Sequence, residues 1–161
     1  MEINKKQLCD FLVKAKKAGY ASSFIFNKIK EKDKSKTISF KLGDWKYNDN
    51  YFGGEPYGGR EVVFYKNQLV CMMVYYGYVD ESFKDFKKVY KFLREALNLI
   101  PEDKPFRGPK NYKNGDFVYL NNFKGKVDSF SGEEFIYFKG KKIYKATYAG
   151  GLVDQRKEKN G

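Results

Sequence analysis

Residues 43–53 read GDWKYNDNYFG and residues 115–125 read GDFVYLNNFKG, so glycines, an aspartate and aromatic side chains return in the same order. A second matched pair follows one residue out of step, because 57–66 reads YGGREVVFYK and 130–139 reads FSGEEFIYFK. Self-similarity at this spacing governs the architecture of a chain. Two copies predict two like halves that pack as one domain and are related by a pseudo-twofold axis.

Each half begins with a segment of helical periodicity. Apolar side chains recur at i, i+3, i+4 and i+7 along residues 4–18, where Leu8 begins the stripe, and again along residues 82–99. This spacing places one apolar face on each helix. Ser82 with Asp85 is typical of a helix start, and Pro101 is expected to end the second helix.

The rest of each half has the short alternating runs and turn residues of antiparallel strands. We therefore predict an α+β fold, in which β-meanders over about 37–77 and 110–151 each follow one helix and pack beneath the helices. The sequence leaves open whether the two meanders merge into one sheet or face each other as two sheets. We expect a single domain over 1–154 and a frayed basic tail over 155–161.

The net charge of +12 comes mostly from lysine and is concentrated in the first third of the chain. A basic surface of this kind favours contact with nucleic acid through residues 2–46, although a lysine-rich composition without such a partner explains it equally well. No apolar run is long enough to span a membrane, and no secretory signal begins the sequence, so we expect a cytoplasmic protein without a membrane partner.

Histidine is absent, which removes the commonest general base and the commonest metal ligand. The two cysteines, Cys9 and Cys71, lie in apolar segments and are expected to be buried free thiols. The sequence therefore points to no catalytic residues, no metal and no cofactor.

Glu61 and Glu134 are the sharpest candidate site residues, because they occupy equivalent places in the two copies. Strand alternation sets each carboxylate beside apolar neighbours, where its pKa rises unless it is paired. Brought together by a pseudo-twofold axis, the two would form an acid/base couple or hold a divalent cation. The alternative is that each glutamate locks its own hairpin through glycine-loop amides or a lysine.

Arg107 lies between two prolines and is a candidate either to clamp an anionic ligand or to pair internally with Asp49, Glu61 or Glu134. Asp49 has Asn121 as its counterpart, an asymmetry that a single pocket requires. The remaining candidate ligand-binding residues are the aromatic side chains Tyr51, Tyr75 and Tyr148.

Nearly the whole chain resembles an uncharacterised family, number 5680 among the domains of unknown function. The matching pieces are Phe11-Leu12-x-x-Ala15-Lys16, Tyr47-x-Asp49-x-Tyr51-x-Gly53-Gly54, Gly59-x-Glu61-Val62-Val63, Met73-x-Tyr75-Tyr76-Gly77, Arg107-Gly108-Pro109 and Tyr148-x-Gly150-Gly151. The resemblance implies a small stand-alone protein, or the C-terminal part of a regulator that begins with a helix-turn-helix domain. It implies no activity, and Cys71, Val74 and Ala149 depart from the pattern.

Taken together, these features predict a binding or sensor-type module without catalytic activity, which recognises a small ligand or a protein partner. One alternative is a nucleic-acid-binding protein that uses its lysine-rich N-terminal third. The other is an enzyme that uses the carboxylates of Glu61 and Glu134. An exposed sheet edge would also allow the chain to form oligomers.

Overall fold

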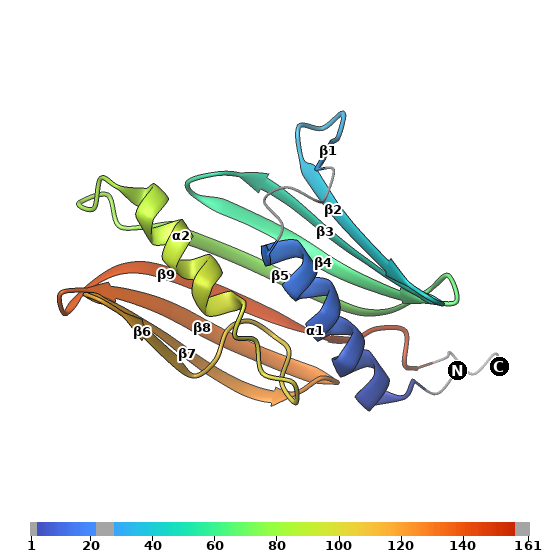
Figure 1. The fold of residues 1–161 in the computed structure, drawn as a ribbon. Coiled ribbons are helices and arrows are strands. Elements are labelled where there is room, and N and C mark those ends of the chain that lie inside the picture. The colour runs from blue at the N-terminus through green and yellow to red at the C-terminus, as the bar shows by residue number, and fades with distance from the viewer. Residues whose placement is uncertain (1–2, 22–27, 157–161) are drawn as a thin grey trace.

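A computed structural model describes residues 3–21 and 28–156 of the chain, which form one antiparallel sheet and two helices (Figure 1). Within those residues the sheet has nine strands in the order β1-β2-β3-β4-β5-β9-β8-β7-β6. The α+β class is therefore confirmed, and the two meanders merge into one sheet. The helices are α1 (Lys5–Ala21) and α2 (Phe86–Leu97), and the strands are β1 (Ile29–Lys30), β2 (Lys36–Leu42), β3 (Trp45–Gly53), β4 (Tyr57–Tyr65), β5 (Gln68–Val79), β6 (Asn111–Asn114), β7 (Phe117–Lys126), β8 (Ser129–Phe138) and β9 (Lys141–Leu152).

Both helices lie on the same face of the sheet, where α1 packs against β2 and β3 and α2 packs against β7 (Figure 1). The predicted apolar stripes are the buried ones, from Leu8 in α1 and from Val89 in α2. The predicted cap of α2 was wrong, because its N-cap is Asp85, which accepts from the backbone N–H of Lys88. Ser82 instead donates its hydroxyl hydrogen to Asp80 in the preceding turn.

Tight turns join the strands close to the predicted places. Gly43 and Gly115 both have φ of 59°, which suits glycine, and they make the first turn of each meander. Lys66 and Asn67 both have positive φ and form the two-residue turn between β4 and β5. Only residues 54–56 separate β3 from β4, since β4 already begins at Tyr57. In the structure the two meanders extend over 36–79 and 111–152, compared with the predicted 37–77 and 110–151.

The two meanders meet at the pairing of β5 with β9, where Cys71 faces Leu152, Tyr75 faces Tyr148 and Val79 faces Tyr144. Strands β4 and β5 are interior strands of the sheet. Along β5 buried and exposed residues alternate, however, because only the face beneath the helices is covered. The opposite face of the sheet is open to solvent along its centre.

The core lies between the helices and the sheet and divides into two clusters, one under α1 and one under α2. Cys71 is a buried free thiol, as expected, whereas Cys9 is only half-buried. Neither described helix is long and apolar enough to cross a membrane. Most of the predicted frayed tail, residues 157–161, lies outside the described residues.

Candidate functional site

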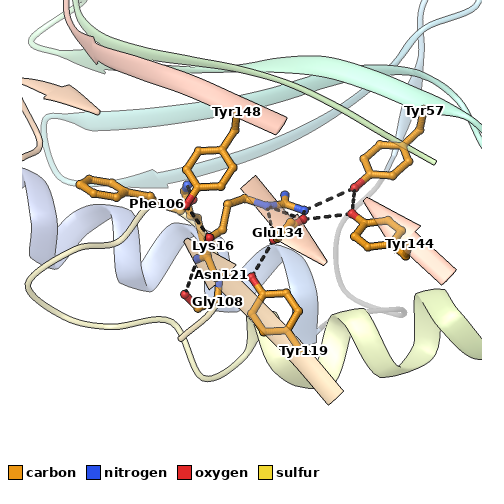
Figure 2. Close-up of polar contacts among 10 residues, drawn as sticks. Lys16, Tyr57, Phe106, Gly108, Tyr119, Asn121, Glu134, Tyr144 and Tyr148 are labelled. Atoms are coloured by element: carbon orange, nitrogen blue, oxygen red, sulfur yellow. Dashed lines mark hydrogen bonds and ion pairs between the residues drawn. The ribbon is translucent and has the colours of Figure 1, made fainter. Parts of the chain in front are cut away.

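A buried ion pair joins Arg107 to Glu134, and Figure 2 shows Glu134 with dashed contacts to Tyr119 and Tyr144. The guanidinium donates from Nη2 to Glu134 Oε1 at 2.5 Å, and from Nε to both carboxylate oxygens at 3.1 and 3.2 Å. Tyr119 and Tyr144 donate their hydroxyl hydrogens to the same carboxylate at 2.7 and 3.0 Å. Glu134 is fully buried, so these bonds replace the water that an ionised carboxylate loses on burial.

The proline-bounded loop at 105–109 carries Arg107 into this position. Asn121 donates from Nδ2 to the Gly108 carbonyl at 2.9 Å, and the Gly108 N–H donates to the Tyr119 hydroxyl at 3.1 Å. Phe106 stacks on Phe130 with ring centroids 3.9 Å apart and planes 5° apart. These contacts fix the loop between the helices and the sheet, where Arg107 pairs with Glu134.

Glu61 is held in the same manner by Lys16 of α1, whose Nζ lies 2.7 Å from Glu61 Oε2 and donates to the Phe106 carbonyl at 2.6 Å. Sequence reasoning did not include Lys16 among the candidate site residues. A signal was available, because Lys16 is eight residues after Leu8 and therefore continues the apolar stripe. Both glutamates thus pair with a cation and stabilise the fold.

The structure does not bring Glu61 and Glu134 together. Strands β5 and β9 lie between β4 and β8, so the two backbones are about 14 Å apart across the sheet alone. Two-carboxylate hydrolysis of glycosides uses carboxyl groups roughly 5 to 9.5 Å apart. Each carboxylate instead pairs with its own cation, Glu61 with Lys16 and Glu134 with Arg107.

Glu61 instead faces Asp49, its direct partner in the pairing of β3 with β4. Burial, followed by the Glu61 carboxylate, raises the pKa of Asp49 to about 7, although the Tyr75 hydrogen bond, Arg107 and Lys16 act in the opposite direction. Tyr75 donates to Asp49 Oδ1 at 2.5 Å. Burial and the Asp49 carboxylate raise the pKa of this phenol, so that Tyr75 stays protonated and remains a donor. Asp49 consequently changes its charge close to neutral pH.

A cavity of about 230 Å³ opens beside Asp49, between the two helices and over β3 to β5. Of the predicted site residues, Asp49, Tyr51, Tyr75 and Arg107 line it, whereas Glu61, Glu134 and Tyr148 are not among its lining residues. The lining residues that sequence reasoning missed include four from α2. These are Tyr90, Leu93, Arg94 and Leu97. Their contribution depends on how the helix crosses the sheet, which no local pattern specifies.

The polar and apolar parts of this cavity are segregated. Asp49, Tyr75 and Arg107 form a polar floor, and the guanidinium carbon of Arg107 lies 5.7 Å from the centre of the Tyr75 ring. Aromatic rings surround the floor, since Tyr57 packs against Tyr75 and Tyr90 at centroid distances of 5.9 and 5.7 Å. Lys28 and Arg94 line the same cavity and are exposed.

The second half repeats one hydrogen bond of this polar floor. Tyr148 donates to Asn121 Oδ1 at 2.8 Å, which repeats the bond from Tyr75 to Asp49. Here the side-chain amide of Asn121 also binds the Gly108 carbonyl, so both ends of the amide are occupied. In the second half Asn121 stands where the first half has Asp49. Its neutral amide makes hydrogen bonds through both the oxygen and the nitrogen.

A larger groove of about 620 Å³ lies between the start of α1 and residues 102–104 and 126–128. Its lining is mainly charged side chains on the surface, and Lys5 pairs with Asp128 across it. It contains none of the predicted site residues and no buried polar side chain. We therefore place the candidate site at the smaller cavity, where a half-buried carboxyl and a buried guanidinium converge.

Nothing in the described residues provides a metal centre. Among 3–21 and 28–156, no three His, Cys, Asp or Glu side chains come close enough together to hold a metal ion. The chemistry available at the cavity is hydrogen bonding and aromatic packing, with one carboxyl that titrates near neutrality.

One family model matches this chain, over residues 49–153, and its description reads Domain of unknown function (DUF5680). Nothing among the curated proteins or the solved structures matches it. The matched range contains the polar floor of the cavity and both buried glutamates, whereas Lys16 of α1 precedes it. Since the model covers well over half of its residues, the chain belongs to the DUF5680 family of domains of unknown function.

Proposed function

We propose that this protein is a binding module for a small ring-bearing molecule, which enters the cavity beside Asp49. The observation that carries the proposal is the polar floor of Asp49, Tyr75 and Arg107 beneath aromatic walls in one defined cavity. Small-molecule sites have this composition, with mainly apolar and aromatic walls and a few convergent polar groups that set orientation.

The size of the cavity limits the ligand. A volume of about 230 Å³ is below the usual range of roughly 300 to 1,000 Å³ for drug-sized ligands, so one or two rings fit. The rings would pack among Tyr51, Tyr57 and Tyr90, which line the cavity. The proposal needs no catalytic step, and the resemblance to domains found behind helix-turn-helix domains agrees with a sensing role.

Asp49 selects the polar group of the ligand. When ionised it accepts hydrogen bonds only, so a ligand N–H donor such as an amide or an amidine satisfies it. When protonated it can also donate. Because its pKa is about 7, a ligand that binds through an N–H donor should bind more tightly as the pH rises through neutrality.

Binding of one-ring probes of matched size, namely benzamidine, benzamide and benzoate, tests the proposal by ligand-observed NMR and calorimetry. Asp49→Asn should abolish the pH dependence and weaken the amidine selectively. Gly54→Leu should weaken the binding of all probes, because Gly54 lines the cavity and the larger side chain would occupy it. The variant should fold, since an added Cβ meets nothing within 4 Å. Tyr148→Phe, which lies in the second half, is the matched control.

Binding that is equal in the wild type, Asp49→Asn and Gly54→Leu would refute the site. Failure of all three probes to bind at millimolar concentration would refute the ligand class. Either result can be interpreted only if each variant is folded. A circular dichroism melt of each variant establishes this.

We also propose that the two halves are related by a pseudo-twofold axis and derive from an internal duplication. In support, Tyr75 pairs with Tyr148, and these two residues are repeat counterparts. The register shifts at Val63/Phe64 and Ile136/Tyr137 are counterparts as well. An experimental structure in which no rotation near 180° superposes β2–β5 on β6–β9 would refute this relationship. The cavity lies beside Asp49, one of the positions at which the two halves differ.

A further inference from the structure

The face of the sheet opposite the helices has no covering element within the described residues, and it carries exposed aromatic rings. Phe52, Tyr76 and Tyr78 are 49%, 54% and 43% exposed. Phe52 faces Gly58 across β3 and β4, and Gly58 faces Tyr76 across β4 and β5, so the rings belong to one row. Soluble proteins rarely display several large aromatic rings together without a partner.

Gly58 has no side chain, so it leaves the neighbouring ring of Tyr76 uncovered on that side. A Cβ on Gly58 would lie 3.1 Å from Cδ2 of Tyr76, so the ring of Tyr76 leans over the bare backbone of β4. Tyr78 lies two residues further along β5 on the same face, with its ring centroid 6.4 Å from that of Tyr76. All three rings are therefore exposed on one face of β3 and β5.

The same face is strongly basic. Strand alternation places six basic residues on the outer side of β3, β4, β7 and β9, all within the described part of the chain. They are Lys46, Arg60, Lys124, Lys126, Lys142 and Lys145. Glu133 is the one acidic side chain on these strand faces, and Lys145 neutralises it at 2.9 Å. The charge that remains is positive on both sides of the aromatic row.

We propose that this open face binds single-stranded nucleic acid, with bases stacked on Tyr76, Tyr78 and Phe52 and phosphates held by the surrounding lysines and Arg60. Exposed aromatic rings within a basic surface are the combination that binds single strands without sequence preference. The proposal is independent of the ligand cavity, which lies on the other face. It also differs from contact through the lysines of residues 2–46, because the three rings and five of the six basic residues lie outside that segment.

The charge distribution argues against the other occupants of an open sheet face. A second copy of the chain would bring two basic surfaces together, and the like charges would repel. A duplex keeps its bases stacked and paired, so it cannot use the exposed rings. Only a flexible polyanion with accessible base faces satisfies both features.

Fluorescence anisotropy with labelled oligo(dT) and oligo(U) of about 20 nucleotides, at low salt, tests the proposal on the full chain. The wild type should bind, with log affinity falling linearly against log salt. Tyr76→Ala should weaken binding roughly 5- to 100-fold, whereas Tyr76→Phe, which keeps the ring, should stay within about twofold of the wild type. Since Tyr76 is exposed, both variants should fold normally.

Lys6→Ala/Lys14→Ala on the solvent face of α1 is the matched control, and a duplex of equal length is the competitor. Retained binding in this double variant, with poor competition by the duplex, supports the proposal. Absence of binding by the wild type, equal binding by Tyr76→Ala, or a loss confined to the α1 variant would overturn it. Concentration-dependent dimerisation that Tyr76→Ala abolishes would also overturn it, in favour of a second copy.

Discussion

Replacement of Asp49 by asparagine should make the protein more stable at high pH and leave its stability almost unchanged at low pH. The substitution removes the charge that shares a buried site with the Glu61 carboxylate. It keeps a hydrogen-bond acceptor for Tyr75, because the second half already uses the same arrangement between Tyr148 and Asn121. The variant therefore isolates the electrostatic contribution of one carboxyl.

The magnitude follows from the pKa of Asp49, which rises from 3.8 to about 7 on folding. A folded-state pKa above the unfolded value means that the folded protein holds the proton more tightly. The favourable contribution is therefore present below about pH 4 and is lost as the pH rises through about 7. At 1.36 kcal/mol for each pH unit between the two pKa values, ionisation of Asp49 lowers the free energy of unfolding by at most about 4 kcal/mol.

Urea denaturation of the wild type and of Asp49→Asn, at intervals between about pH 4 and pH 8.5, measures this difference. The two free energies of unfolding should agree at the acid end, separate between about pH 4 and pH 7, and differ by a constant amount in favour of the variant above neutrality. Asp116→Asn, a change at an exposed carboxylate in a turn, is the control and should stay within about 0.5 kcal/mol of the wild type. A difference independent of pH, or a variant less stable than the wild type at pH 8, would refute the reasoning.

Arg107→Ala should lower the free energy of unfolding by about 3 to 5 kcal/mol, because it leaves a buried carboxylate unpaired. Arg60→Ala, at an exposed arginine, should leave it almost unchanged, and equal losses for the two variants in urea melts would contradict this account. Lys16→Met should lower the free energy of unfolding by a similar amount, and the double variant Lys16→Met/Glu61→Leu should recover most of that stability. Simple additivity in this double-mutant cycle would exclude the pairing. Gly132→Ala should destabilise by roughly 1 to 3 kcal/mol, since the new Cβ would lie 2.3 Å from the Tyr148 hydroxyl oxygen, and a thermal melt unchanged from the wild type would show that this contact is relieved freely.

The fold was largely accessible from sequence because its signals are local. The repeated glycines at 43 and 115 specify turns, and the stripe that begins at Leu8 specifies a buried helix face. The merging of the two meanders into one sheet was not accessible. It depends on β5 pairing with β9, an interaction between residues far apart in sequence that local periodicity does not encode.

The site was only partly accessible for a related reason. Residue chemistry drew attention to Asp49, Tyr75 and Arg107, and they do converge on one cavity. The symmetry of Glu61 and Glu134 suggested a partnership that the strand order prevents. Lys16 was overlooked because a lysine on a helix is usually solvated, whereas here a facing carboxylate offsets the cost of its burial. Such pairings become visible only once the elements are placed in three dimensions.

The seam between β5 and β9 also has a consequence for synthesis on the ribosome. As the nascent chain emerges, β5 appears complete while its partner is still untranslated, and the pairing of Cys71 with Leu152 must wait for the last strand. Until then β5 is an unpaired edge that other chains can extend, which favours aggregation. Cells that produce this protein rapidly should therefore depend on chaperones that shield that edge during translation.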